Sequence, residues 1–184
     1  MSTMPDVVTH RYDPLCGACL NLCSLPDDEA LRVVETLRGT SRPTLKPDYL
    51  VRRRAAEEWL MREAASALQR PLRESPVYFF LGDFSYFADP SRPAALVLPL
   101  ASLPSDGITF TLGDSMRVAE QSGRKVWKLE EIAALFARGE PVGDFGLSDQ
   151  SGYQSQFIEM QVWERTSVLS QLPQRQEPES AESN

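Results

Sequence analysis

The stretch from Pro76 to Phe84, PVYFFLGDF, constrains the fold of this chain more than any other segment. Five consecutive large apolar or aromatic residues follow a proline and stop at Gly82-Asp83, which is a turn signal. A short apolar run closed by a turn is typical of a strand buried on both faces. Residues 77–81 are therefore expected to form a central strand, around which the rest of the chain is organised.

Two long helical patterns precede this strand, and a shorter one follows it. Residues 26–39 open with a proline and three acidic residues, which suit the positive end of a helix dipole, and they close at a glycine. Residues 48–68 carry apolar side chains at helical spacing. Residues 129–138 repeat that spacing over a shorter range. We predict a helix at each of these positions.

Four further segments are predicted strands. Residues 19–25, 94–98 and 108–112 are short apolar or β-branched runs bounded by Gly or Pro. Residues 156–163 alternate apolar with polar or aromatic side chains. The order of helices and strands predicts an α+β fold with a mixed, mostly antiparallel central sheet, on which the N-terminal helices pack.

The chain has 184 residues, which is enough for one domain with a substantial core. Residues 1–14 are expected to be an arm with little regular structure, and residues 15–170 a single globular domain. Residues 139–152, rich in Gly, Asp and Ser, are expected to be an exposed loop. The acidic tail, residues 171–184, has almost nothing to bury and is expected to be disordered.

The charge balance bears on partners and location. The net charge of −7 argues against non-specific binding to a nucleic acid. No run approaches the roughly 18 apolar residues that span a membrane, and residues 1–10 lack a signal-peptide pattern. A cytoplasmic location without a membrane contact is expected. Basic residues concentrate between 46 and 73, as a solvated helix face or as a site for phosphate or pyrophosphate.

Three cysteines, Cys16, Cys19 and Cys23, lie within eight residues, and the lone histidine, His10, is six residues upstream. Thiolates and imidazole are zinc ligands, so a structural zinc site is one interpretation. On a strand, however, Cys19 and Cys23 would lie about 13 Å apart. The favoured interpretation is that Cys19 and Cys23 are small buried residues without a metal, and that His10 is exposed in the arm.

Glu159 and Gln161 are the strongest catalytic candidates. On the predicted last strand they share a face with Phe157 and Trp163, opposite an apolar stripe. A carboxylate between aromatic residues can be desolvated, and it can stabilise a cationic transition state. The alternative is an ordinary edge strand whose polar residues face solvent.

Six segments follow one another in a recognisable order. They are 19–38, 48–68, Val77-Tyr78-Phe79-Phe80, Ala95-Leu96-Val97-Leu98-Pro99-Leu100, Ile108-Thr109-Phe110-Thr111-Leu112 and Gln154-x-Gln156-Phe157-Ile158-Glu159. Over residues 19–164 this order resembles the ADP-ribosyltransferase fold, and it is most similar to the DNA-targeting toxins of the DarT group. In that group a Tyr-Phe strand is followed by an apolar strand, a Thr-rich strand and a late strand with the catalytic glutamate.

The resemblance implies that NAD is the substrate and that ADP-ribose is transferred to an acceptor. By position, Glu159 would orient the ribose and the nucleophile, with Gln161 beside it, and Tyr78 would stack on the nicotinamide. Asn21 and Ser24 would hold the adenosine side of NAD.

Arg53, with its neighbours Arg52 and Arg54, would meet the pyrophosphate of NAD. The implied partner is a small-molecule nucleotide. The acidic balance favours a protein or small-molecule acceptor over a nucleic acid.

The chain departs from the family at two positions. The first predicted strand has Asn21 where the family has Arg or His, and Gln156 stands where the glutamate is expected. Three hypotheses therefore stay open: an NAD-consuming transferase, a non-catalytic binding or regulatory module with the same fold, and a small zinc protein that uses Cys16, Cys19 and Cys23.

Overall fold

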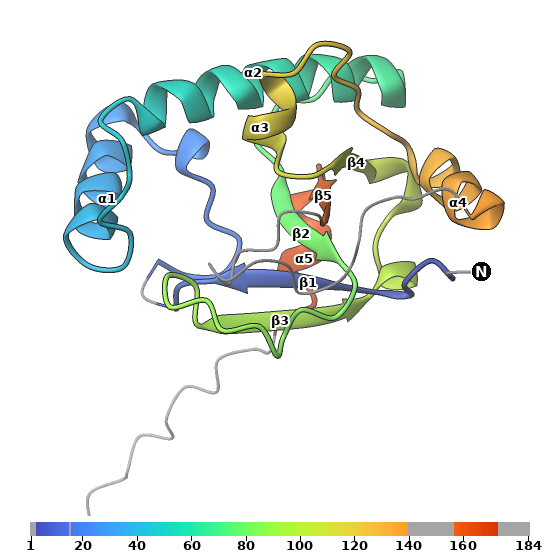
Figure 1. Cartoon of the computed structure of the whole chain (residues 1–184), viewed down its shortest axis with the longest axis horizontal. Coiled ribbons are helices and arrows are strands. Elements are labelled where there is room, and N and C mark those ends of the chain that lie inside the picture. The colour runs from blue at the N-terminus through green and yellow to red at the C-terminus, as the bar shows by residue number, and fades with distance from the viewer. Residues whose placement is uncertain (1–2, 15, 140–156, 173–184) are drawn as a thin grey trace, which may run out of the picture.

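Five antiparallel strands form one sheet in the order β3-β1-β2-β5-β4 (Figure 1). The structure is a computed structural model that describes residues 3–14, 16–139 and 157–172. The strands are β1 (Val7–Tyr12), β2 (Val77–Leu81), β3 (Ala94–Pro99), β4 (Ile108–Leu112) and β5 (Ile158–Val162). The expected α+β fold is confirmed, and the strand pairs of the described sheet are all antiparallel, where a mixed, mostly antiparallel sheet was expected.

In the described part of the chain, five α-helices and three short 3₁₀ segments accompany the strands. The helices are α1 (Asp27–Gly39), α2 (Tyr49–Leu68), α3 (Ser115–Ala119), α4 (Leu129–Arg138) and α5 (Arg165–Leu169), and the 3₁₀ segments are Leu22–Ser24, Leu100–Ser102 and Ser105–Gly107. The three predicted helices are confirmed. The helices α3 and α5 were not predicted, because five residues are too few to show a helical repeat. Within the described residues, no helix is both long and apolar enough to span a membrane.

The N-terminal segment is a strand inside the sheet, so the prediction of an irregular arm over residues 1–14 is wrong. β1 lies between β3 and β2, with Val8 opposite Leu81 on β2 and opposite Leu98 on β3. Its four middle residues, 8–11, are all buried. Three of them are polar, so the segment lacks the apolar pattern of a buried strand. Sequence alone does not show the partners that satisfy buried polar groups.

Residues 19–25 do not form a strand, and that prediction is also wrong. Cys19 has a φ of 66°, and Leu22–Ser24 form a single turn of 3₁₀ helix. The side chain of Asn21 caps this turn by accepting a hydrogen bond from the Cys23 amide at 2.9 Å. Such local side-chain bonds give the backbone an alternative to strand pairing.

The two faces of the sheet have different coverings. One face is apolar and packs against α4 and α5. It contributes Phe79, Leu81, Phe110, Ile158, Met160 and Val162 to a core with Ile132, Leu135 and Val168. The other, which we call the polar face, carries Tyr78, Phe80, Thr109, Thr111, Glu159 and Gln161.

The polar face is covered by α2 and α3. Trp59 and Leu60 of α2 form a second core with Val118 of α3 and with Trp163, which follows β5. Figure 1 shows α2 lying along this side of the sheet, with α3 between it and β4.

Two predictions about strand exposure need correction. β2 is fully buried on one face only, because Tyr78 and Phe80 are half-buried where they meet a cavity. β5 is not an edge strand, because it pairs with both β2 and β4, and all five of its residues are buried. The predictions for the loop at 140–152 and for the tail from residue 173 fall outside the described residues.

Candidate functional site

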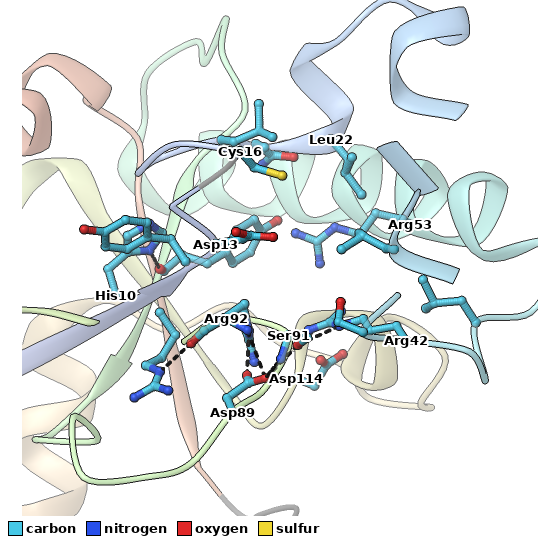
Figure 2. Close-up of a pocket in the computed structure, with 18 of the residues that line it drawn as sticks. His10, Asp13, Cys16, Leu22, Arg42, Arg53, Asp89, Ser91, Arg92 and Asp114 are labelled. Carbon is cyan, nitrogen blue, oxygen red and sulfur yellow. Dashed lines mark hydrogen bonds and ion pairs between the residues drawn. The ribbon is translucent and has the colours of Figure 1, made fainter. Parts of the chain in front are cut away.

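A cavity of about 630 Å³ opens beside the polar face, and four of the predicted site residues line it. They are Asn21, Arg53, Tyr78 and Glu159, which come from four different parts of the chain. Loops 41–45 and 84–92 complete the wall (Figure 2). Two other candidates do not line the cavity: Ser24 is exposed at the end of its 3₁₀ turn, and Gln161 is buried within the sheet layer.

Arg53 is one of the arginines that line this cavity. Its guanidinium carbon lies 4.3 Å from the centroid of the Tyr78 ring. Its one ion pair is with Glu57, at a loose 3.6 Å, and it makes no hydrogen bond to the residues that the structure describes. Figure 2 shows the guanidinium pointing into the cavity, on the side that faces Asp13. Its N–H groups are therefore available to an anionic ligand.

The charge on Arg53 is secure despite its burial. Burial lowers the pKa of Arg53, but the neighbouring acidic groups, Tyr78, Glu57 and Glu159 among them, outweigh this effect and leave the pKa raised. The side chain is only 14% exposed, so solvent screens this charge weakly.

Glu57 of α2 is a site residue that the sequence analysis missed. Its Oε2 accepts hydrogen bonds from the Tyr78 hydroxyl at 2.9 Å and from Asn21 Nδ2 at 3.0 Å. Glu57 is only 4% exposed. The sequence held one signal, because Glu57 lies four residues after Arg53 on the same helix face.

Glu159 is a buried carboxyl group in the wall of the cavity. It lies opposite Phe80 of β2 and Thr111 of β4 in the sheet. Burial and the nearby Asp114 carboxylate raise the pKa of Glu159 to about 7, although Arg53 and two hydrogen bonds favour the ionised form. A carboxyl group with this pKa can exchange a proton near neutral pH.

Gln161 supports Glu159 from behind and does not reach the cavity. A continuous chain of hydrogen bonds runs through the sheet: Trp163 Nε1 donates to Thr109 Oγ1, Thr109 Oγ1 donates to Gln161 Oε1, and Gln161 Nε2 donates to Glu159 Oε1. The backbone N–H of Ser115 donates to the same carboxylate oxygen at 3.3 Å. These donors fix the orientation of Glu159.

The mouth of the cavity is held by a polar link between two loops. Arg42 Nε donates to Ser91 Oγ at 2.9 Å, and Asp89 accepts hydrogen bonds from Ser91 and Arg92 (Figure 2). The loop before α2 and the loop before β3 are thereby joined across the opening.

The histidine is buried, so the prediction of an exposed His10 is wrong. Its Nδ1 lies 2.7 Å from the Tyr78 carbonyl oxygen, and its Nε2 accepts a hydrogen bond from the Cys19 amide at 3.1 Å. The imidazole is therefore neutral with its proton on Nδ1, and burial lowers its pKa. Both nitrogens are used by the backbone, so His10 is not placed to bind a metal.

The three cysteines have three different environments. Cys16 is exposed at the cavity, Cys19 is buried and Cys23 is half-buried. Within the described ranges, no group of three or more His, Cys, Asp or Glu residues is close enough together to hold a metal ion.

No family model matches this chain, and no curated protein or solved structure matches it either. The fold and the site define a class of protein by the chemistry of its cavity. It is an α+β domain whose cavity combines a buried arginine, an aromatic floor and a carboxyl group with a pKa near 7. This combination suits a small ligand that carries both phosphate and a planar ring.

Proposed function

We propose that the cavity binds NAD and that the protein transfers ADP-ribose to a protein or small-molecule acceptor. The observation that carries the proposal is that Arg53 and Glu159 line the same cavity. One offers unused N–H donors to a pyrophosphate, and the other offers a carboxylate to a ribose on which positive charge develops. The resemblance in the order of elements is the reason for choosing NAD, although its first expected strand, residues 19–25, does not form.

In the proposed reaction the bond between ribose C1′ and the nicotinamide nitrogen breaks. Its electron pair leaves with the nicotinamide, which becomes neutral, and positive charge develops on the ribose. The acceptor supplies the electron pair of the new bond to C1′. Glu159 in its ionised form stabilises the charged ribose and takes the proton that the acceptor releases.

The aromatic residues take roles that follow from their neighbours. Arg53 covers one face of the Tyr78 ring, and the Tyr78 hydroxyl is bound to Glu57. Tyr78 therefore serves as the platform for Arg53. Phe80 lies directly opposite Glu159 in the strand pair and contacts Phe157 edge to face at 4.9 Å. We place the nicotinamide ring against this aromatic pair.

A non-catalytic nucleotide-binding module is the second candidate, and the contacts of Asn21 favour it. Both donors of its amide are used, by Glu57 and by the Pro76 carbonyl, and its oxygen accepts from the Cys23 amide. Asn21 therefore has no free donor for the adenosine side of NAD. A protein that binds through Arg53 but lacks this second anchor would hold a nucleotide without cleaving it.

Nicotinamide release from NAD distinguishes the two candidates. The transferase hypothesis predicts release by the wild-type protein and a loss of about 100-fold or more in Glu159→Gln. Glu74→Gln makes the same change at an exposed position and should release nicotinamide at the wild-type rate. Release that is absent in the wild type, or unchanged in Glu159→Gln, overturns the enzymatic proposal.

A further inference from the structure

A buried carboxylate joins three of the residues that line the cavity. Glu57 receives the Tyr78 hydroxyl and the Asn21 amide on a single oxygen, Oε2, and its nearest cation is Arg53. The partners come from α2, from β2 and from the segment before α1. One side chain thus ties together three parts of the cavity wall that are far apart in sequence.

The geometry separates the two charges more than an ordinary ion pair does. Two neutral donors occupy Oε2, and the Arg53 nitrogen stays at 3.6 Å, beyond hydrogen-bond distance. The other oxygen, Oε1, is buried and has no hydrogen-bond partner among the described residues. A buried carboxylate and a buried guanidinium usually form close, charge-assisted hydrogen bonds, which are absent from this pair.

Tyr78 explains why Arg53 does not move closer. Its hydroxyl is fixed on Glu57 Oε2 at 2.9 Å, so its ring is held in place and supports the guanidinium 4.3 Å above it. Arg53 is attracted toward Glu57 and at the same time held over the ring. Its hydrogen-bonding edge is left facing the cavity (Figure 2).

We infer that Glu57 is a positioning residue, which holds Tyr78 and Arg53 so that the guanidinium is preorganised to bind the diphosphate group of a nucleotide ligand. The inference rests on the proposed function only for the identity of that anionic group. A free arginine side chain loses substantial rotamer entropy when it binds an anion. Glu57 removes much of this loss before the ligand arrives.

Binding of ADP-ribose, measured by calorimetry, tests the inference without requiring catalysis. Glu57→Gln removes the charge that attracts Arg53 but keeps a side-chain oxygen with two lone pairs, which can still accept from Tyr78 and Asn21. We expect ADP-ribose affinity to fall about tenfold or more, which is the loss typical of hydrogen bonds to a charged group. Glu58→Gln is the matched control, because Glu58 is the next residue of α2 and is exposed.

Tyr78→Phe is the second variant and removes only the hydroxyl. If Glu57 acts through Tyr78, the double variant binds ADP-ribose no more weakly than Glu57→Gln alone. If the two residues act independently, the two losses in affinity multiply. Tyr78→Phe also keeps the test valid if Glu57→Gln does not fold, and it should then weaken binding about threefold or more.

Cys23 supplies a readout in the free protein. Burial and the Glu57 charge raise the pKa of the Cys23 thiol to about 12. Loss of the charge in Glu57→Gln should lower this pKa and speed the alkylation of Cys23 at pH 9. Peptide mapping measures the alkylation at Cys23. A Cys23 alkylation rate equal to that of Glu58→Gln contradicts the effect of Glu57 on the Cys23 thiol.

The outcomes separate this inference from the proposed function. If ADP-ribose binds and Glu57→Gln weakens it, the inference holds even when NAD is not cleaved. If NAD is cleaved but Glu57→Gln binds ADP-ribose as tightly as the wild type, or more tightly, the inference fails. Glu57 would then only compete with the ligand for Arg53. A wild-type protein that binds neither ADP-ribose nor inorganic pyrophosphate also overturns it.

Discussion

Glu159, a single residue of this cavity, destabilises the fold when it is ionised. Its pKa is raised from 4.5 to about 7 in the folded chain, chiefly by burial. A raised pKa gives stability that is fully present below 4.5 and is lost as the pH rises through 7. At alkaline pH the ionised carboxylate therefore costs the fold on the order of 3 kcal/mol.

Glu159→Gln should accordingly stabilise the protein in a pH-dependent way. The amide keeps the shape of the side chain but cannot ionise. We expect the free energy of unfolding in urea to rise by about 2–3 kcal/mol at pH 8.5 and to change little at pH 4.5. An equal effect at both pH values would show that Glu159 is not a buried titrating group.

His10 has the opposite dependence on pH. Burial lowers its pKa, so the unfolded chain takes up a proton at a pH where the folded chain does not. The stability that His10 contributes is present above 6.5 and is lost as the pH falls below that value. The stability advantage of the wild type over His10→Gln should therefore be larger at pH 7.5 than at pH 5.5 in urea unfolding. A constant difference contradicts a neutral His10 in the fold.

At the scale of elements, a buried hydroxyl on β1 adds to the backbone bonds that join β1 to the end of β2. Thr9 Oγ1 donates to the Gly82 carbonyl at 2.7 Å and accepts from the Phe84 amide at 2.8 Å. Gly82 has a φ of 115°, which a residue with a side chain rarely adopts. The hydroxyl thus fixes the turn that leads into the cavity loop.

Thr9→Val keeps the volume of this side chain and removes both hydrogen bonds. Two buried backbone groups lose their partner, so we expect a loss of about 2 kcal/mol in the free energy of unfolding. Thr36→Val is the control at an exposed position on α1, where the hydroxyl bonds only within its own helix. A loss at Thr9 no larger than that at Thr36 would contradict the role of β1 in the interior of the sheet.

For the whole molecule, local patterns predicted the elements that depend on local sequence. Helices at 26–39 and 48–68 and the strand at 108–112 carry their own periodicity, and all three are present. β1 and the segment at 19–25 were predicted wrongly. The state of each depends on partners far away in the sequence, such as Leu81 for Val8 and Glu57 for Asn21, which is 36 residues away.

The residues of the candidate site were likewise predicted only in part. Alternation along the last strand pointed to Glu159, and the basic cluster pointed to Arg53. Glu57 was missed, because the sequence of a charged helix does not show which of its glutamates is buried. Gln161 was assigned to the site because it shares a strand face with Glu159. Of these two residues, only Glu159 lines the cavity.

The central claim is that Arg53 binds a phosphate-bearing nucleotide in the cavity, and calorimetric titration with ADP-ribose tests it most directly. Arg53→Met keeps the length of the aliphatic chain and removes the guanidinium, and Arg62→Met is the matched change at an exposed position of α2. We predict that the wild type and Arg62→Met bind ADP-ribose alike and that Arg53→Met loses about 100-fold in affinity. Equal affinity of the wild type and Arg53→Met would contradict the claim.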